Sequence, residues 1–115
     1  MNANTRACVA YIAAGLSGLT TVTALYDHTE TKPLNVSGVV SAEKIDVYDF
    51  DRSCHVSGNL ENLYDYGNSA HIQIAVNGDK FSGYDYASKF HFNGTVESGV
   101  VQIYDYETEV YYRYS

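Results

Sequence analysis

The sequence contains no tryptophan, one proline (Pro33) and one methionine, and it has few basic residues. Seven Lys and Arg residues stand against fourteen Asp and Glu residues in a chain of 115, which gives a formal net charge of -7. Proteins that bind DNA or RNA need a concentrated basic patch to neutralise phosphates. We therefore expect no nucleic-acid partner. With 45% hydrophobic residues, the chain is nevertheless apolar enough to form the core of one folded domain.

Cysteines and long apolar runs are also scarce. Cys8 and Cys54 are too few for a disulfide framework, and we expect both to be reduced. The apolar stretch from Ala7 to Leu19 is too short for a bilayer span, which needs about 20 residues, so we expect no membrane partner. Followed by Val22-Thr23-Ala24, the same stretch has some features of a signal peptide. We expect a cytoplasmic protein, or a secreted one if residues 1–24 are a signal peptide.

Motifs for catalysis and for metal binding are missing. The four histidines show no metal-ligand spacing, and no H-E-x-x-H, C-x-x-C or G-x-S-x-G motif occurs. Ser53, Cys54 and His55 are reactive residue types, but neighbours on a strand point to opposite faces and do not form a nucleophile–base pair. We therefore predict no catalytic residue, no metal and no cofactor, and we expect a binding protein rather than an enzyme. An enzyme stays open as a third class, which would need a cleft that brings a histidine within hydrogen-bond reach of a carboxylate or hydroxyl. A metal held by distant residues, for example His71 with His91, stays open as an alternative.

Tyrosine and glycine are abundant, with twelve and nine residues, and both recur in a pattern. A Ser-Gly or Asn-Gly pair returns about every 20 residues, and a Tyr-Asp triplet ending in an aromatic residue or histidine lies between successive pairs. The glycine pairs are Ser17-Gly18, Ser37-Gly38, Ser57-Gly58, Asn77-Gly78 and Ser98-Gly99, and the triplets begin at Tyr26, Tyr48, Tyr64, Tyr84 and Tyr104. This divides the chain into units near residues 17–36, 37–56, 57–76, 77–97 and 98–115.

The units have the pattern of β-hairpins. Apolar and polar residues alternate, as in the segment 71–76, HIQIAV, which is the period of a half-buried strand. Ser-Gly and Asn-Gly pairs supply the positive φ of tight turns, and polar residues after each Tyr-Asp form a second turn. We predict one all-β domain over residues 1–115, an antiparallel meander of about ten short strands that closes as a barrel or a two-sheet sandwich. A β-solenoid is the alternative, although the Tyr-Asp triplet shifts within the unit, which stacked solenoid coils would not allow.

The N-terminal segment 4–14 fits two structures. It can form an α-helix capped by Asn4 or Thr5 and ending at Gly15, or a strand buried on both faces. The sequence leaves this choice open.

The last segment, residues 110–114, is an aromatic strand at the end of the chain, and an unpaired strand edge promotes association. It pairs either with the first strand, which would bring Cys8 or its neighbours beside it, or with a second copy in a homo-oligomer.

The triplet aspartates, Asp27, Asp49, Asp65, Asp85 and Asp105, are expected at one end of the hairpin series. There they can form an acidic rim that binds Ca²⁺ or a cationic partner, or each can accept backbone N–H bonds in an Asx turn. We favour the Asx turn as their main role.

The tyrosines crowd the second half of the chain, and each combines a flat apolar face with a polar tip, a chemistry suited to sugars, peptides and proteins. We predict a ligand-binding surface made of Tyr64, Tyr66, Tyr84, Tyr86, Tyr104 and Tyr106 together with the intervening Asp65, Asp85 and Asp105.

The final unit, FNGTVESGVVQIYDYETEVYYRYS, resembles small uncharacterised bacterial all-β proteins that carry serial Ser-Gly and Tyr-Asp-Tyr hairpin units. The resemblance extends loosely over residues 17–115 and implies no activity. From the residues themselves we expect a non-enzymatic binding or interaction module with a protein, peptide or glycan partner. The alternative is a small barrel that encloses an apolar small molecule, and an internal pocket would distinguish it.

Overall fold

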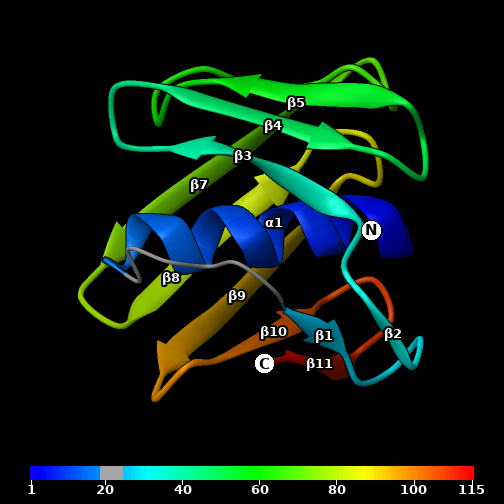
Figure 1. Cartoon of the computed structure of the whole chain (residues 1–115), viewed down its shortest axis with the longest axis vertical. Coiled ribbons are helices and arrows are strands. Elements are labelled where there is room, and N and C mark those ends of the chain that lie inside the picture. Colours follow the sequence, from blue (N-terminus) through cyan, green and yellow to red (C-terminus); the bar gives the residue numbers. More distant parts are fainter. Residues whose placement is uncertain (19–24) are drawn as a thin grey trace.

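The computed structural model describes residues 1–18 and 25–115, which form one α-helix and eleven β-strands (Figure 1). The possible cleavage site Val22-Thr23-Ala24 lies outside the described residues. The elements are α1 (Ala3–Leu16), β1 (Tyr26–Asp27), β2 (Lys32–Pro33), β3 (Val36–Val40), β4 (Ile45–Asp49), β5 (Cys54–Gly58), β6 (Leu63–Asp65), β7 (Ala70–Asn77), β8 (Lys80–Asp85), β9 (Phe90–Glu97), β10 (Val100–Asp105) and β11 (Val110–Tyr114).

All eleven strands belong to one antiparallel sheet, which confirms the predicted all-β meander. The alternative, a β-solenoid, is wrong. The strand order is β2-β1-β11-β10-β9-β8-β7-β6-β5-β4-β3, so β2 and β3 form its two edges and the sheet is not closed. Instead of a closed barrel or two packed sheets, one strongly curved sheet wraps around α1, which crosses the enclosed space (Figure 1). The helix fills the volume that a barrel of this size would otherwise have to fill with strand side chains.

The N-terminal segment is a helix because the strands of the sheet pack around it. Small and apolar residues line every side of α1, and nine of its fourteen residues are buried. A helix that is apolar all round is stable only inside a protein. Its N-cap is Asn2, whose side chain accepts a hydrogen bond from the Thr5 N–H, so the predicted caps at Asn4 or Thr5 are wrong by a few residues. The C-cap is Ser17, two residues beyond the predicted stop at Gly15. No helix among the described residues is long and apolar enough to cross a membrane.

Two of the five glycine pairs form the predicted hairpin turns. Gly78 and Ser98-Gly99 have positive φ and join β7 to β8 and β9 to β10. Ser37-Gly38 and Ser57-Gly58 are not turns, because they lie within β3 and β5. At Gly38 the neighbouring strand approaches so closely that a Cβ would lie 2.0 Å from a backbone oxygen. The pair Ser17-Gly18 ends α1 and is not a hairpin turn.

The last strand is not a sheet edge. β11 pairs with β10 on one side and with β1 on the other, where Tyr114 faces Asp27. The last strand therefore pairs with the first strand of the sheet, as one alternative predicted, and does not provide an edge for a second copy. That first strand is β1 and not segment 4–14, which is helical. The helix nevertheless approaches β11, since the guanidinium carbon of Arg6 lies 3.5 Å from the ring centroid of Tyr112.

Candidate functional site

The outer face of the sheet carries four clusters of three rings each, which we call the ring clusters. In each, a central tyrosine contacts an aromatic residue two positions later and a histidine or tyrosine on the next strand, with ring centroids 4.7 to 4.9 Å apart. The clusters are Tyr48 with Phe50 and His55, Tyr64 with Tyr66 and His71, Tyr84 with Tyr86 and His91, and Tyr104 with Tyr106 and Tyr111.

Local geometry explains the clusters. Residues two apart on a strand share a face, so Tyr84 and Tyr86 point outward together. The hairpin register then places His91 directly opposite Tyr84. The same seven-residue step joins Tyr48 to His55, Tyr64 to His71 and Tyr104 to Tyr111. Cross-strand aromatic pairs in edge-to-face geometry stabilise a sheet modestly.

The third ring was missed in the sequence. Four of the five triplet tyrosines are followed seven residues later by a histidine or tyrosine, whereas Tyr26 is followed there by Pro33. This spacing was the available signal, but the histidines were considered only as possible metal ligands. Among the residues that the structure describes, no group of three or more His, Cys, Asp or Glu side chains is arranged to hold a metal ion.

Within the predicted site, the tyrosines divide into two groups. Tyr64, Tyr84 and Tyr104 are the half-buried centres of their clusters. Their outer partners are exposed, with exposed fractions of 59% for Tyr66, 52% for Tyr86 and 46% for Tyr106. Tyr111, which the prediction did not include, is exposed by 62%. The outer rings therefore form the accessible aromatic surface.

The predicted Asp65, Asp85 and Asp105 lie on the opposite, inner face and are at most 2% exposed. Together with Asp27 and Asp49, each accepts through Oδ1 a hydrogen bond of 2.9 to 3.1 Å from the backbone N–H two residues later. This is the favoured Asx turn. The fourth residue after each Asp completes the turn with a positive φ of 51 to 66°. These carboxylates hold the turns that carry the outer rings, and they do not reach the surface.

In Asp49, Asp65 and Asp105, the second carboxylate oxygen, Oδ2, accepts hydrogen bonds from arginine or threonine side chains near the N-terminal half of α1. Arg52 donates from Nε to Asp49 Oδ2 at 2.6 Å and from Nη1 to Asp65 Oδ2 at 3.1 Å, and Thr5 also donates to Asp65. Arg6 Nη1 lies 3.4 Å from Asp105 Oδ2. The positive end of the helix dipole adds to this compensation. The aspartates at this end of the sheet therefore form a buried network of hydrogen bonds and ion pairs that joins the helix to the sheet.

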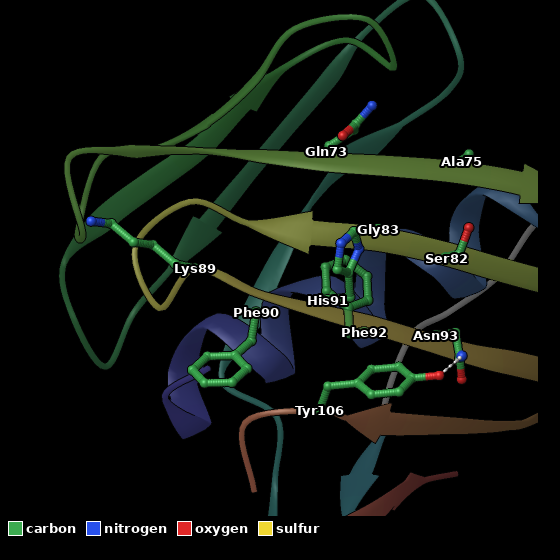
Figure 2. A pocket seen from close by; sticks show the side chains of 10 residues that line it. All are labelled: Gln73, Ala75, Ser82, Gly83, Lys89, Phe90, His91, Phe92, Asn93 and Tyr106. Atoms are coloured by element: carbon green, nitrogen blue, oxygen red, sulfur yellow. Dashed lines mark hydrogen bonds between the residues drawn. The ribbon is translucent and has the colours of Figure 1, made fainter. Parts of the chain in front are cut away.

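The outer face of β7 to β10 is hollowed into a shallow groove, which we call the outer trough. One part, of about 570 Å³, lies beside Tyr106, and a second, of about 490 Å³, continues from it toward Tyr111. The two parts share Ala75, Ser82 and Asn93. Figure 2 shows the Tyr106 ring reaching over the trough, with its hydroxyl accepting a 2.9 Å hydrogen bond from Asn93 Nδ2.

Neither cysteine is poised for nucleophilic chemistry. Cys8 is fully buried beside Asp49, and burial, reinforced by that carboxylate, raises the pKa of its thiol far above the usual value. Burial also raises the pKa of Cys54, which is partly exposed. Both cysteines are free, in agreement with the expected reduced state. A thiol with a raised pKa is a poor nucleophile near neutral pH.

No protein-family model, curated protein or solved structure matches the chain. Function must therefore be inferred from the side chains that the fold presents.

Proposed function

We propose that this protein is a non-enzymatic binding module whose contact surface consists of the exposed rings of the ring clusters. The observation that carries the proposal is the exposure of Tyr66, Tyr86 and Tyr106, each between 46% and 59%, at equivalent positions of three successive clusters. Exposed aromatic groups in contiguous sets mark binding surfaces, because tyrosine loses little entropy when it is buried by a partner. The aspartates that were predicted with them act in this proposal by holding the turns.

The alternative of an enclosed apolar ligand has less support. The space inside the curved sheet is occupied by α1, whose Val9 and Ile12 are fully buried (Figure 1). The same packing supports retention of residues 3–16 in the folded protein, because removal of residues 1–24 as a signal peptide would empty the core.

The test compares the wild-type protein with a Tyr66→Ala, Tyr86→Ala, Tyr106→Ala variant on a glycan array and in pull-downs from a cell extract. Exposed rings contribute little to folding, so the free energy of unfolding should fall by no more than about 1 kcal/mol per ring. Every specific interaction of the wild type should be lost. A Glu43→Ala, Glu61→Ala variant, which changes two exposed acidic residues, is the control and should bind like the wild type. Binding that survives in the triple variant would contradict the proposal.

A further inference from the structure

We infer that the outer trough is a saccharide-binding site that holds a short oligosaccharide across β7 to β10, next to Tyr106 and Tyr111. This inference rests on the proposed binding function and names the class of its ligand. It depends on the charge, the shape and the hydrogen-bonding groups of the trough, taken together.

The trough differs from the rest of the molecule in charge. The chain has twice as many acidic as basic residues, yet no Asp or Glu lines either part of the trough. Its only charged lining residues are Lys89 and Lys80, one in each part. A cationic ligand finds no carboxylate there, whereas a neutral or weakly anionic ligand meets no repulsion.

The polar groups of the trough are neutral donors and acceptors. Gln73, Asn93 and Gln102 supply amides, and Ser82 and Thr95 supply hydroxyls. An amide donates and accepts at the same time, and a hydroxyl does both, which matches the hydroxyl groups of a sugar. These side chains alternate along their strands with buried residues such as Ile74 and Phe92, so the rigid sheet holds them in a fixed outward array.

Two exposed aromatic rings, Tyr106 and Tyr111, lie at one side of this array, since both contact the Tyr104 ring. Tyr106 is held by its hydrogen bond to Asn93 (Figure 2). Tyr111 packs against Tyr104, with ring centroids 4.8 Å apart. The floor of the trough contains small residues, including Ala75 and Gly83. A flat apolar sugar face can lie on a tyrosine ring while the sugar hydroxyls reach the amides.

A peptide ligand fits less well. Peptides bind to sheets mainly by adding a strand at a free edge, where backbone groups are unpaired. The strands β7, β8, β9 and β10 are interior strands with partners on both sides. A large protein partner needs an apolar centre with buried anchors, whereas the centre of the trough is small and polar.

The test is a titration of ¹⁵N-labelled protein with hexasaccharides of β-1,4-glucose, β-1,3-glucose, β-1,4-mannose and β-1,4-N-acetylglucosamine, followed by NMR. The inference predicts that at least one of them shifts amide signals of β7 to β10. Ser82→Arg, which fills the trough from an exposed position, should weaken this binding by about tenfold or more. Ser37→Arg, an equivalent change at an exposed serine of β3 outside the trough, should leave the affinity within about twofold.

The outcomes separate this inference from the proposed function. If no hexasaccharide binds, or if Ser82→Arg leaves binding unchanged, the saccharide trough is wrong. If a ligand from the array or extract still depends on Tyr66 and Tyr86, the proposed function survives that failure. If the triple tyrosine variant and the wild type behave alike with every ligand, both are wrong.

Discussion

The ring of Phe92 lies directly over Gly83 of the neighbouring strand, and a Cβ at Gly83 would be 2.4 Å from its terminal carbon. The relationship is reciprocal, because Phe81 covers Gly94 in the same way on the same pair of strands. Each glycine makes room for the other strand's ring, and both rings are buried against the core. Because neither glycine carries a side chain, each phenylalanine ring can lie against the backbone of the paired strand on the inner face of β8 and β9, where the sheet bends around α1.

Gly83→Ala should therefore destabilise the protein by about 1 to 3 kcal/mol, because the added methyl group overpacks the ring and the adjacent backbone. Urea unfolding measures the change. Gly78→Asn is the control, since a Cβ there meets no atom within 4 Å and asparagine tolerates the positive φ of that turn. Equal losses in the two variants would contradict the role of the Phe92 contact.

Two buried aspartates should respond oppositely to the change to asparagine. Asp49 Oδ2 accepts a 2.6 Å bond from Arg52, so Asp49→Asn breaks an ion pair and should cost about 3 kcal/mol or more. Asp85 Oδ2 is buried without a hydrogen-bond partner among the described residues. Asp85→Asn keeps the Oδ1 acceptor for the Ala87 N–H and removes an uncompensated charge, so stability should be unchanged or higher. Thermal unfolding of both variants checks this, and a large loss at Asp85 would show that its charge is compensated.

Stability should fall at alkaline pH through Tyr114. Its side chain is fully buried, and burial raises the pKa of its hydroxyl well above the ordinary value of 10.0. Below pH 10 both the folded and the unfolded chain keep the proton, so no effect is expected there. Above pH 10.0 the unfolded chain loses the proton while the folded chain retains it, and the free energy of unfolding decreases as pH rises. Tyr114→Phe should reduce this decrease, as measured by urea midpoints at pH 8 and pH 11 (about two units below and one unit above that value). An identical pH dependence in the variant would rule Tyr114 out as a contributor.

The two thiols should differ in accessibility. Cys8 is fully buried with a raised pKa, so it should react with a disulfide reagent at neutral pH only when the protein unfolds. Cys54 is partly exposed, and its raised pKa should make its reaction slower than that of a free cysteine. The rates of reaction with the disulfide reagent, measured on Cys8→Ala and Cys54→Ser variants with and without urea, assign each kinetic phase to one cysteine. Fast labelling of Cys8 in the native protein would mean that α1 leaves the core readily.

The sequence by itself determined the features that depend on neighbouring residues. Alternation in segments such as 71–76 predicts strands, and Asp followed by polar residues predicts the Asx turns, because both arise from backbone geometry over a few residues. The meander follows from the same signals, since short turns leave successive strands only an antiparallel arrangement.

Only the tertiary structure decided the rest. Segment 4–14 has no decisive local preference, and it becomes a helix because packing inside the curved sheet buries nine of the fourteen residues of α1 and leaves none of them fully exposed. The sheet stays open because its edge strands, β2 and β3, do not pair with each other, and the helix occupies the interior. The ring clusters and the outer trough depend on which side chains face each other across strands, a register set by turn length and packing rather than by the residues themselves. For that reason the tyrosines were predictable as a group, while their division into buried centres and exposed rings was not.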